Sequence, residues 1–292
     1  MFRDKIITFF AFFAKLLLRI YKPSIILIAG TDGKTSSAFA IAEIIKKNHT
    51  IYLNHNEDLL SAILSLFHIG RGPKSLTDYL IFFFRILWFL LWPRNYPDFL
   101  IIEIESEQAG DMNIAGAIFR PDVLIFPSMV VSPENAHFQN NRSIQREYAS
   151  LLQYLPPDGY IIANADDNNC FAMTRASRDC RTFSYGFHSE SDLQLSDHRT
   201  VYAEAGSSPS VPAGIDFSIN YNGEVIGCHR ANTVSRLHAY TGAAAFAVSV
   251  LLEIPHVLAA DTISRSMIAP GRMKLLTAVK GAIIIDLSLI HI

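Results

Sequence analysis

SIILIAGTDGKTSSAFAIAEIIKK, residues 24–47, is the stretch that decides the fold. Its first part, Ser24–Ala29, is a short run of isoleucine and leucine with nothing charged inside it, which predicts a strand buried on both faces. From Ala38 to Ile45 the apolar residues recur at helical spacing and predict a helix. The glycine-rich segment between them therefore turns a buried strand into a helix.

That turn is made of the residues Gly30, Thr31, Asp32, Gly33, Lys34, Thr35 and Ser36. Backbone N–H groups at a helix N-terminus point at one spot, and the helix dipole favours an anion there. Lys34 can reach terminal phosphates, and the Thr35 hydroxyl can ligate Mg²⁺. The usual G-x-x-x-x-G-K-[ST] pattern would need a glycine at position 28, which is Ile28. A chance Gly-Lys-Thr is the alternative, but the strand before and the helix after favour a phosphate-binding loop.

Length and composition exclude several classes of protein. The 292 residues are enough for one large domain or two small ones, and the net charge of −2 gives no basic footprint for nucleic acid. The three cysteines, Cys170, Cys180 and Cys228, have neither metal-binding nor redox spacing and fit a reducing cytoplasm.

Two segments hold most of the excess hydrophobicity. Residues 1–21 are interrupted by Lys5, Lys15 and Arg19 and lack a cleavage site, which favours a helix lying on a membrane surface or packed on the domain. Residues 79–92, YLIFFFRILWFLLW, are too few to span a bilayer comfortably. We expect this second helix to be buried or to touch lipid headgroups, and peripheral membrane contact stays a hypothesis.

Further buried strands end in polar side chains. Residues 97–105 end in the carboxylates of Glu103 and Glu105, and the strand at 160–163 runs into Asn164-Ala165-Asp166-Asp167. Open α/β sheets bind ligands outside the carboxyl ends of their strands, so these side chains can face a nucleotide. The alternatives are solvated acids at a strand end and an ordinary Asn/Asp turn.

Three motifs carry a resemblance to a known family: GTDGKTS at 30–36, NADD at 164–167 and PGRM at 270–273. Together they resemble the Mur ligases, ATP-dependent enzymes that add amino acids to peptidoglycan precursors. The chain looks closest to the branch that adds D-alanyl-D-alanine to UDP-MurNAc-tripeptide. The resemblance implies an α/β fold, a mostly parallel sheet of P-loop NTPase type flanked by helices. The alternating runs between residues 181 and 228 predict a small antiparallel annex.

The resemblance also implies roles for single residues. Lys34 would neutralise the γ-phosphate of ATP, while Thr35 and Glu103 would hold Mg²⁺. Asn164 and Asp166 would lie near the adenine, and Arg272 near the ribose or phosphates. The family's histidine that follows the strand at 122–127 is either replaced by Glu134, a candidate metal ligand, or shifted to His137, a candidate catalytic residue. His238 resembles a family histidine, but a capping or packing role is favoured.

One departure concerns a lysine. The resemblance places a carbamylated lysine that ligates a second Mg²⁺ at position 148, where this chain has Tyr148. No lysine occurs between Lys74 and Lys274, so no side chain in that stretch can take up CO₂ in its place. A neutral phenol is a poor Mg²⁺ ligand, and this puts full ligase activity in doubt more than nucleotide binding.

The expected organisation has three parts. Residues 1–22 form an N-terminal hydrophobic or amphipathic helix, 23–286 the central ATP-binding domain, and 287–292 a tail that departs from the family pattern. A strand at 281–286 closes the domain. We expect the family's C-terminal domain to be missing, and we therefore expect the chain to bind Mg·ATP yet to ligate poorly or not at all.

The resemblance implies a UDP-MurNAc-peptide-like acceptor and an amino acid or dipeptide as substrates. We expect a monomer in the cytoplasm, with the inner face of the membrane as an alternative place. Two other functions stay open: a nucleotide-binding subunit that works with another protein, and a membrane-edge scaffold with a degenerate ATP site.

Overall fold

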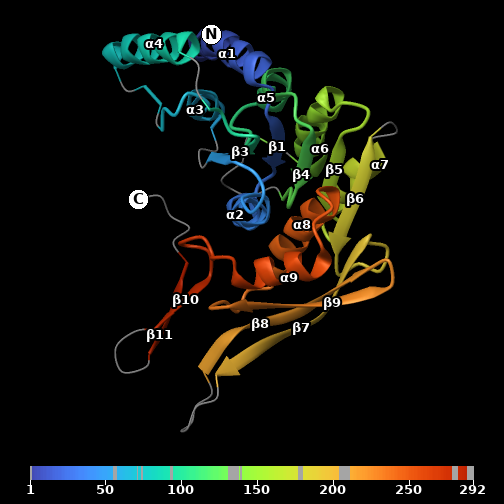
Figure 1. The fold of residues 1–292 in the computed structure, drawn as a ribbon. Coiled ribbons are helices and arrows are strands. Elements are labelled where there is room, and N and C mark those ends of the chain that lie inside the picture. The colour runs from blue at the N-terminus through green and yellow to red at the C-terminus, as the bar shows by residue number, and fades with distance from the viewer. Residues whose placement is uncertain are drawn as a thin grey trace.

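The computed structural model describes residues 2–54, 58–70, 72–73, 75–92, 95–130, 138, 140–176, 180–203, 211–277 and 282–287. Within them, a nine-stranded sheet runs through the molecule in the order β2-β3-β1-β4-β5-β6-β7-β8-β9 (Figure 1). In sequence order the strands are β1 (Ser24–Ala29), β2 (Ile51–Asn54), β3 (Phe99–Ile104), β4 (Val123–Phe126), β5 (Tyr160–Asn164), β6 (Arg181–Gly186), β7 (Leu193–Ala203), β8 (Val211–Tyr221) and β9 (Glu224–Ala231).

Along the sheet, the pairing of neighbouring strands changes once, from parallel to antiparallel. Neighbours from β2 to β7 pair in parallel, whereas β7, β8 and β9 pair antiparallel. The predicted parallel sheet and its antiparallel annex are thus confirmed, although β6, the first of the runs expected in the annex, belongs to the parallel part. The β8–β9 turn has positive φ at Asn222 (50°) and Gly223 (82°), the hairpin geometry that the Asn-Gly pair predicts.

A second, two-stranded sheet pairs β10 (Lys274–Thr277) with β11 (Ile283–Asp286). The strand predicted at the end of the chain is β11. It closes this small sheet and does not join the main one. Its Asp286 side chain accepts a hydrogen bond from the Gly271 N–H at 2.8 Å, which fastens the PGRM segment to β11.

Helices cover both faces of the main sheet. They are α1 (Phe2–Tyr21), α2 (Lys34–Ile45), α3 (Leu59–Ser65), α4 (Leu76–Leu91), α5 (Asp111–Phe119), α6 (Asn141–Ala149), α7 (Asn168–Ala176), α8 (Leu237–Leu251) and α9 (His256–Arg265), with a 3-10 turn, η2 (Ser150–Tyr154), after α6. On one face of the sheet a hydrophobic core forms beneath α2, α8 and α9. On the opposite face a second core forms beneath α1 and α3–α7 (Figure 1).

The alternation of side chains along the strands decides to which face of the sheet the polar end of β3 points. Leu27 lies in the α1 core, while Ile26 and Ile28 lie in the α2 core. Glu103 is the parallel partner of Ile28 and therefore points to the α2 face of the sheet. This alternation brings a carboxylate to the start of α2.

The helix predicted over residues 1–21 is α1. Side chains such as Phe10 and Leu17 are buried against the domain, and α1 runs directly into β1. In the described residues, no helix is both long and apolar enough to cross a membrane.

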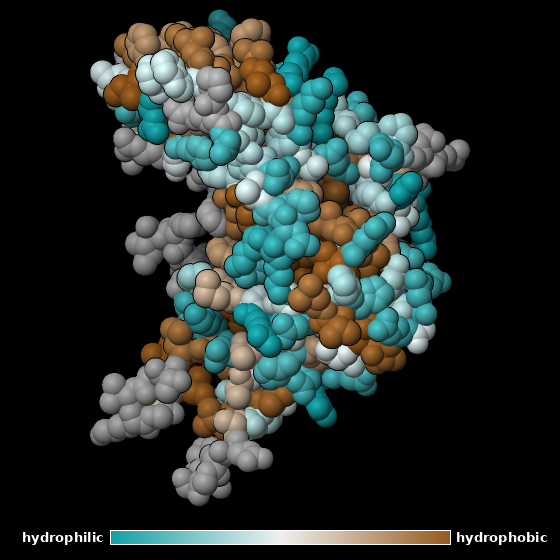
Figure 2. Space-filling model, in the orientation of Figure 1, coloured by the Kyte–Doolittle hydropathy of each residue, from teal (hydrophilic) through white to brown (hydrophobic). Residues whose placement is uncertain are grey.

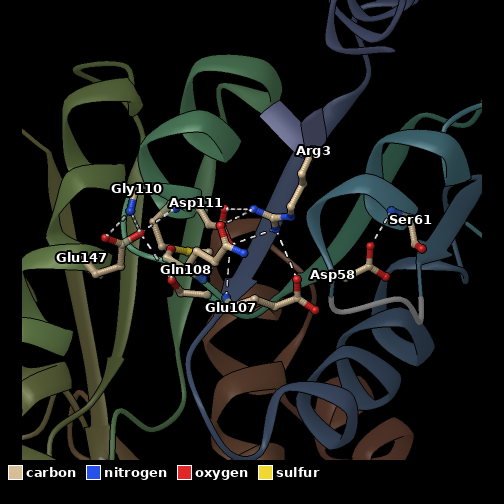
Figure 3. Close-up of polar contacts among 10 residues, drawn as sticks. Arg3, Asp58, Ser61, Glu107, Gln108, Gly110, Asp111 and Glu147 are labelled. Carbon is tan, nitrogen blue, oxygen red and sulfur yellow. Dashed lines mark hydrogen bonds and ion pairs between the residues drawn. The ribbon is translucent and has the colours of Figure 1, made fainter. Parts of the chain in front are cut away.

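Arg3 anchors the start of α1 to the loop after β3 (Figure 3). Its guanidinium donates to both oxygens of the buried Asp111 carboxylate, at 2.9 and 3.2 Å, and to Glu107 at 3.2 Å. The same loop is held from α6, because the Glu147 carboxylate accepts from the N–H groups of Gly110 and Met112 at 2.9 Å. Carboxylates thus satisfy the free N–H groups at the N-terminus of α5.

We expect Arg3→Ala to lower the free energy of unfolding by about 1–2 kcal/mol, because it removes a two-pronged charged contact from the nearly buried Asp111. Urea denaturation followed by circular dichroism measures the effect. Lys5→Ala, on the exposed side of the same helix, is the control and should change stability little. Equal losses in the two variants would contradict the anchoring role.

Candidate functional site

The loop between β1 and α2 depends on two glycines. Gly33, which precedes α2, has φ 78°, a left-handed conformation that costs glycine little. At Gly30 a Cβ atom would lie much closer to the Ser128 carbonyl oxygen than van der Waals contact allows. That same oxygen accepts the Thr31 N–H at 2.8 Å, so the loop is pinned to the end of β4.

Lys34 folds back over this loop. Its Nζ donates to the Thr31 carbonyl oxygen at 2.9 Å and to the Glu105 carboxylate at 2.7 Å. Only 3% of its side chain is exposed, against 27% for Glu105. The sequence pointed to Lys34 as a phosphate ligand, but the ion pair with Glu105 was not predicted.

Thr35 and Glu103 form a second contact beside it. The Thr35 hydroxyl donates to the Glu103 carboxylate at 2.6 Å, and Glu103 is fully buried. A hydroxyl and a carboxylate are the hard oxygen ligands that Mg²⁺ prefers. In the described part of the chain no cluster of three or more His, Cys, Asp or Glu residues forms a metal site. Two protein oxygens fit an ion that takes its remaining ligands from phosphate and water.

Tyr148 lies directly behind the loop and is fully buried. Its hydroxyl donates to the Gly30 carbonyl oxygen at 3.1 Å and accepts from the Ser106 N–H at 3.4 Å. The side chain that stands where the resemblance implies a metal-binding lysine therefore joins α6 to the phosphate loop and to the end of β3.

The NADD segment braces the same region from β5. Asn164 donates from its side-chain amide to the Pro127 carbonyl oxygen at 3.0 Å. Asp167 accepts from the Met129 N–H at 2.8 Å and from the Ser128 hydroxyl at 3.2 Å. Since Ser128 also holds Thr31, the chain between residues 127 and 129 links the NADD turn to the phosphate loop.

Asp166 points to the other side of this turn. Its carboxylate accepts from the N–H groups of Phe187 and His188 at 2.8 Å and from the Tyr240 hydroxyl at 2.7 Å. Burial first, and then this carboxylate, raise the pKa of Tyr240. The Arg236 guanidinium lies 3.7 Å from the centre of the Phe187 ring. This aromatic and basic group carries no sequence motif, and only the packing of α8 on β6 reveals it.

The backbone of Arg272 is tied to α8. The carbonyl oxygen of Arg272 is 2.8 Å from His238 Nε2, and the neighbouring Leu237 packs beside Gly33. His238 is 1% exposed, and its burial lowers its pKa to about 4. The favoured packing role of His238 agrees with this buried position, and the Nε2–H tautomer donates to the carbonyl.

The structure thus brings the loop residues 30–36, Glu103, Asn164 and Asp166 to the carboxyl ends of neighbouring strands, with the PGRM segment tied to α8 nearby. Glu134 and His137 lie outside the described residues. Tyr240 and Arg236 lie at the edge of the site and were not predicted, whereas Glu105 was expected at the strand end and only its pairing with Lys34 was not.

The buried His238 predicts a pH dependence of stability. Because its pKa is about 4 in the folded chain and near 6.5 when unfolded, only the unfolded chain gains a proton between these values. Stability should therefore fall as the pH drops through this window. The His238→Gln variant keeps a donor for the carbonyl. Between pH 7 and pH 5 we expect its free energy of unfolding to fall by about 2 kcal/mol less than that of the wild type. Urea unfolding at both pH values measures this, and parallel losses would refute it.

The sequence matches the family model described as the Mur ligase middle domain over residues 28–232. The UDP-N-acetylmuramate–L-alanine ligase of Alkaliphilus metalliredigens is 27% identical over 150 residues, which make up 51% of this chain and 30% of that protein. That of Caldanaerobacter subterraneus is 24% identical over the same length.

Solved structures share the fold at low sequence identity. MurF from Acinetobacter baumannii has a TM-score of 0.74 at 13% identity, covering 95% of this chain and 53% of its own. MurF ligase from Thermotoga maritima in complex with ADP has a TM-score of 0.73 at 16% identity, covering 96% and 56%. This chain thus spans just over half the length of these ligases. Because the family match covers more than half of the sequence, the chain belongs to the Mur ligase middle domain family.

Proposed function

We propose that this chain binds Mg·ATP and forms the ATP-binding part of an ATP-dependent carboxylate–amine ligase of cell-wall precursor synthesis. The observation that carries the proposal is the pairing of two residues at the start of α2 with two carboxylates at the end of β3. Lys34 faces Glu105 at 2.7 Å, and Thr35 faces Glu103 at 2.6 Å. Phosphate-binding loops need a cation and a hydroxyl at these two positions.

The loop supplies the binding energy for the triphosphate. The backbone N–H groups around Gly33 and the N-terminus of α2 offer donors to the phosphate oxygens. Lys34 exchanges the Glu105 carboxylate for the γ-phosphate and neutralises charge there. The loop is held rigid by Ser128 and Tyr148, so little order has to be gained when ATP binds.

Thr35 and Glu103 are the residues that would hold Mg²⁺, and the hydroxyl and carboxylate oxygens they offer fit that ion. When bound, Mg²⁺ supplies charge neutralisation on the phosphate oxygens. Glu134 is the proposed ligand for a second ion, and His137 is a proposed catalytic residue. Asn164, Asp166 and Arg272 are proposed to line the nucleotide side of the site.

The proposed reaction has two steps. A substrate carboxylate oxygen attacks the γ-phosphorus, which gives an acyl phosphate and ADP. An amine then attacks the acyl carbon, the amide bond forms, and inorganic phosphate leaves with the carbon–oxygen electron pair. The chain's own residues contribute positioning and charge stabilisation, which phosphoryl transfer chiefly needs.

The names of the relatives suggest the substrates. The curated relatives join L-alanine to UDP-N-acetylmuramate, so we propose a UDP-MurNAc-peptide-like acceptor, with an amino acid or dipeptide as the amine. The fold similarity to MurF fits the dipeptide branch.

We place the protein in the cytoplasm as a monomer, where free Cys170, Cys180 and Cys228 are in keeping with reducing conditions. Residues 23–286 are the proposed domain, and weak ligation by these 292 residues alone remains our expectation.

Tyr148 favours a second candidate. It is buried against the loop in place of a metal-binding lysine, so the site can bind nucleotide without completing ligation. A nucleotide-binding subunit would keep ATP affinity but need another protein for amide formation. A membrane-edge scaffold with a degenerate site would have lost ATP affinity as well.

We expect Lys34→Ala to weaken Mg·ATP binding by about 30-fold or more, because it removes the cation that faces the γ-phosphate. Titration calorimetry with a non-hydrolysable ATP analogue measures the dissociation constant. Lys46→Ala is the matched control, since Lys46 caps the other end of α2 and pairs with Glu43. An unchanged affinity in Lys34→Ala, or no binding by the wild type, would refute the nucleotide site.

We expect Glu103→Gln to bind the nucleotide with a much smaller enhancement by Mg²⁺, because a neutral amide replaces the carboxylate oxygen beside Thr35. The readout is the ratio of ATP affinities with Mg²⁺ and with EDTA, and circular dichroism checks that the variant folds. A ratio equal to that of the wild type would exclude Glu103 as the metal ligand.

A further inference from the structure

Helices α1 and α4 carry a large apolar surface that their own core leaves uncovered. The two helices meet through aromatic contacts, with the Phe83 ring centre 5.9 Å from those of Phe9 and Phe13. The exposed large apolar side chains on their outer faces are Phe9, Phe12, Leu16, Ile20, Leu80, Ile81, Phe84, Leu87, Trp88, Leu91 and Trp92. We call this set the α1–α4 face. Figure 2 shows apolar side chains gathered over α1 and α4 at the top of the molecule.

These exposures are high for single residues of this size. Phe12 is 65% exposed, Phe84 63% and Leu91 68%. Contiguous exposed apolar surface of this kind marks a docking site, whereas apolar residues exposed singly are ordinary on protein surfaces. Side chains on the inner side of the same helices, such as Phe10 and Phe82, are buried, so the helices pack on the domain through that side.

The charged side chains that the structure describes as exposed on this face all have one sign. Among the described side chains of α1 and α4, four charged ones are exposed, and all four are cations: Lys5, Lys15, Arg19 and Arg85. They lie within the apolar stripe, as Lys15 and Arg19 alternate with Leu16 and Ile20. A dry protein interface would bury these cations at high cost without partners. Anionic headgroups would pair with them while the apolar side chains enter the acyl boundary.

Two features of α4 point the same way. Trp88 and Trp92 stack with ring centres 4.9 Å apart at the end of the helix, and tryptophan prefers the level of lipid headgroups. A hollow of about 480 Å³ opens beside Trp88. Arg85 sits among apolar walls in that hollow, including Ile81 and Phe84, which suits one anionic headgroup and the start of its chain.

We propose that the α1–α4 face docks the protein on the surface of an anionic phospholipid bilayer, with both helices lying in the plane of the membrane. The opposite side of the sheet, with α8, α9 and the β8–β9 hairpin, then faces away from the lipid (Figure 1). Arg3 and the buried side of α1 hold this face rigidly to the loop after β3. Docking is independent of the proposed ligase activity.

The sequence provides its own probe, because its two tryptophans, Trp88 and Trp92, both lie on this face. The full chain is mixed with vesicles of phosphatidylcholine alone or of phosphatidylcholine with phosphatidylglycerol. We expect flotation with the anionic vesicles, a blue shift of the tryptophan emission and quenching by brominated lipid. Added salt should weaken the binding. No shift and no flotation would overturn the proposal.

Variants separate the apolar from the charged contribution. Phe12→Ser with Phe84→Ser, which keeps both tryptophans, should reduce partitioning about tenfold or more. Lys15→Glu with Arg19→Glu should reduce it by a similar factor on anionic vesicles only. Val257→Ser, at an apolar residue of α9 that is 78% exposed, and Arg142→Glu on α6 are the controls and should bind like the wild type.

The competing occupant is a second copy of the chain. A dimer in light scattering that dissociates in the Phe12→Ser, Phe84→Ser variant would overturn lipid docking, since the face would then be covered by protein. Equal binding to neutral and anionic vesicles would also contradict the role given to the four cations. A monomer that floats with anionic vesicles supports the proposal.

Discussion

The structure depends on how the chain turns from β1 into α2 beside the end of β3. The turn places Lys34 and Thr35 at the first positions of α2, where backbone N–H groups lack helical partners. Two carboxylates from β3 meet these residues at 2.7 and 2.6 Å. The Glu103 carboxylate is completely buried, so its charge has to be compensated within the site. In this structure the protein's own side chains meet this need for compensating contacts. A bound cation together with the loop lysine would meet the same need.

The loop is supported from three other elements. Ser128 at the end of β4 and Tyr148 from α6 hydrogen-bond to the loop backbone, and Asn164 and Asp167 at the end of β5 in turn hold residues 127–129. A loop fixed in this way loses little entropy on binding a phosphate group. Tyr148 shows how a position that the family resemblance assigns to metal binding can take up a structural role, because a phenol can bridge the Gly30 carbonyl oxygen and the Ser106 N–H.

The N-terminal helix packs on the core of the sheet. Its inner side contributes to the core under β1, and Arg3 joins it to Asp111 and Glu107. Its outer side, together with α4, is apolar and cationic. The hydrophobic excess of the sequence therefore has two physical destinations, the core on one side and an uncovered surface on the other.

The sequence by itself determined the parallel strands, the phosphate-loop turn, the β8–β9 hairpin and the candidate residues from Gly30 to Ser36, because strand and helix periods and turn residues are local signals. It indicated Glu103 through its place at a strand end and through the family resemblance. Tertiary structure alone decided that Glu105 pairs with Lys34, that Tyr148 supports the loop and that Asp166 is held by Tyr240. These contacts join residues 71, 118 and 74 positions apart, respectively, and no local pattern encodes such distances. The strand β11 also needed the structure, since only packing decided which sheet it joined.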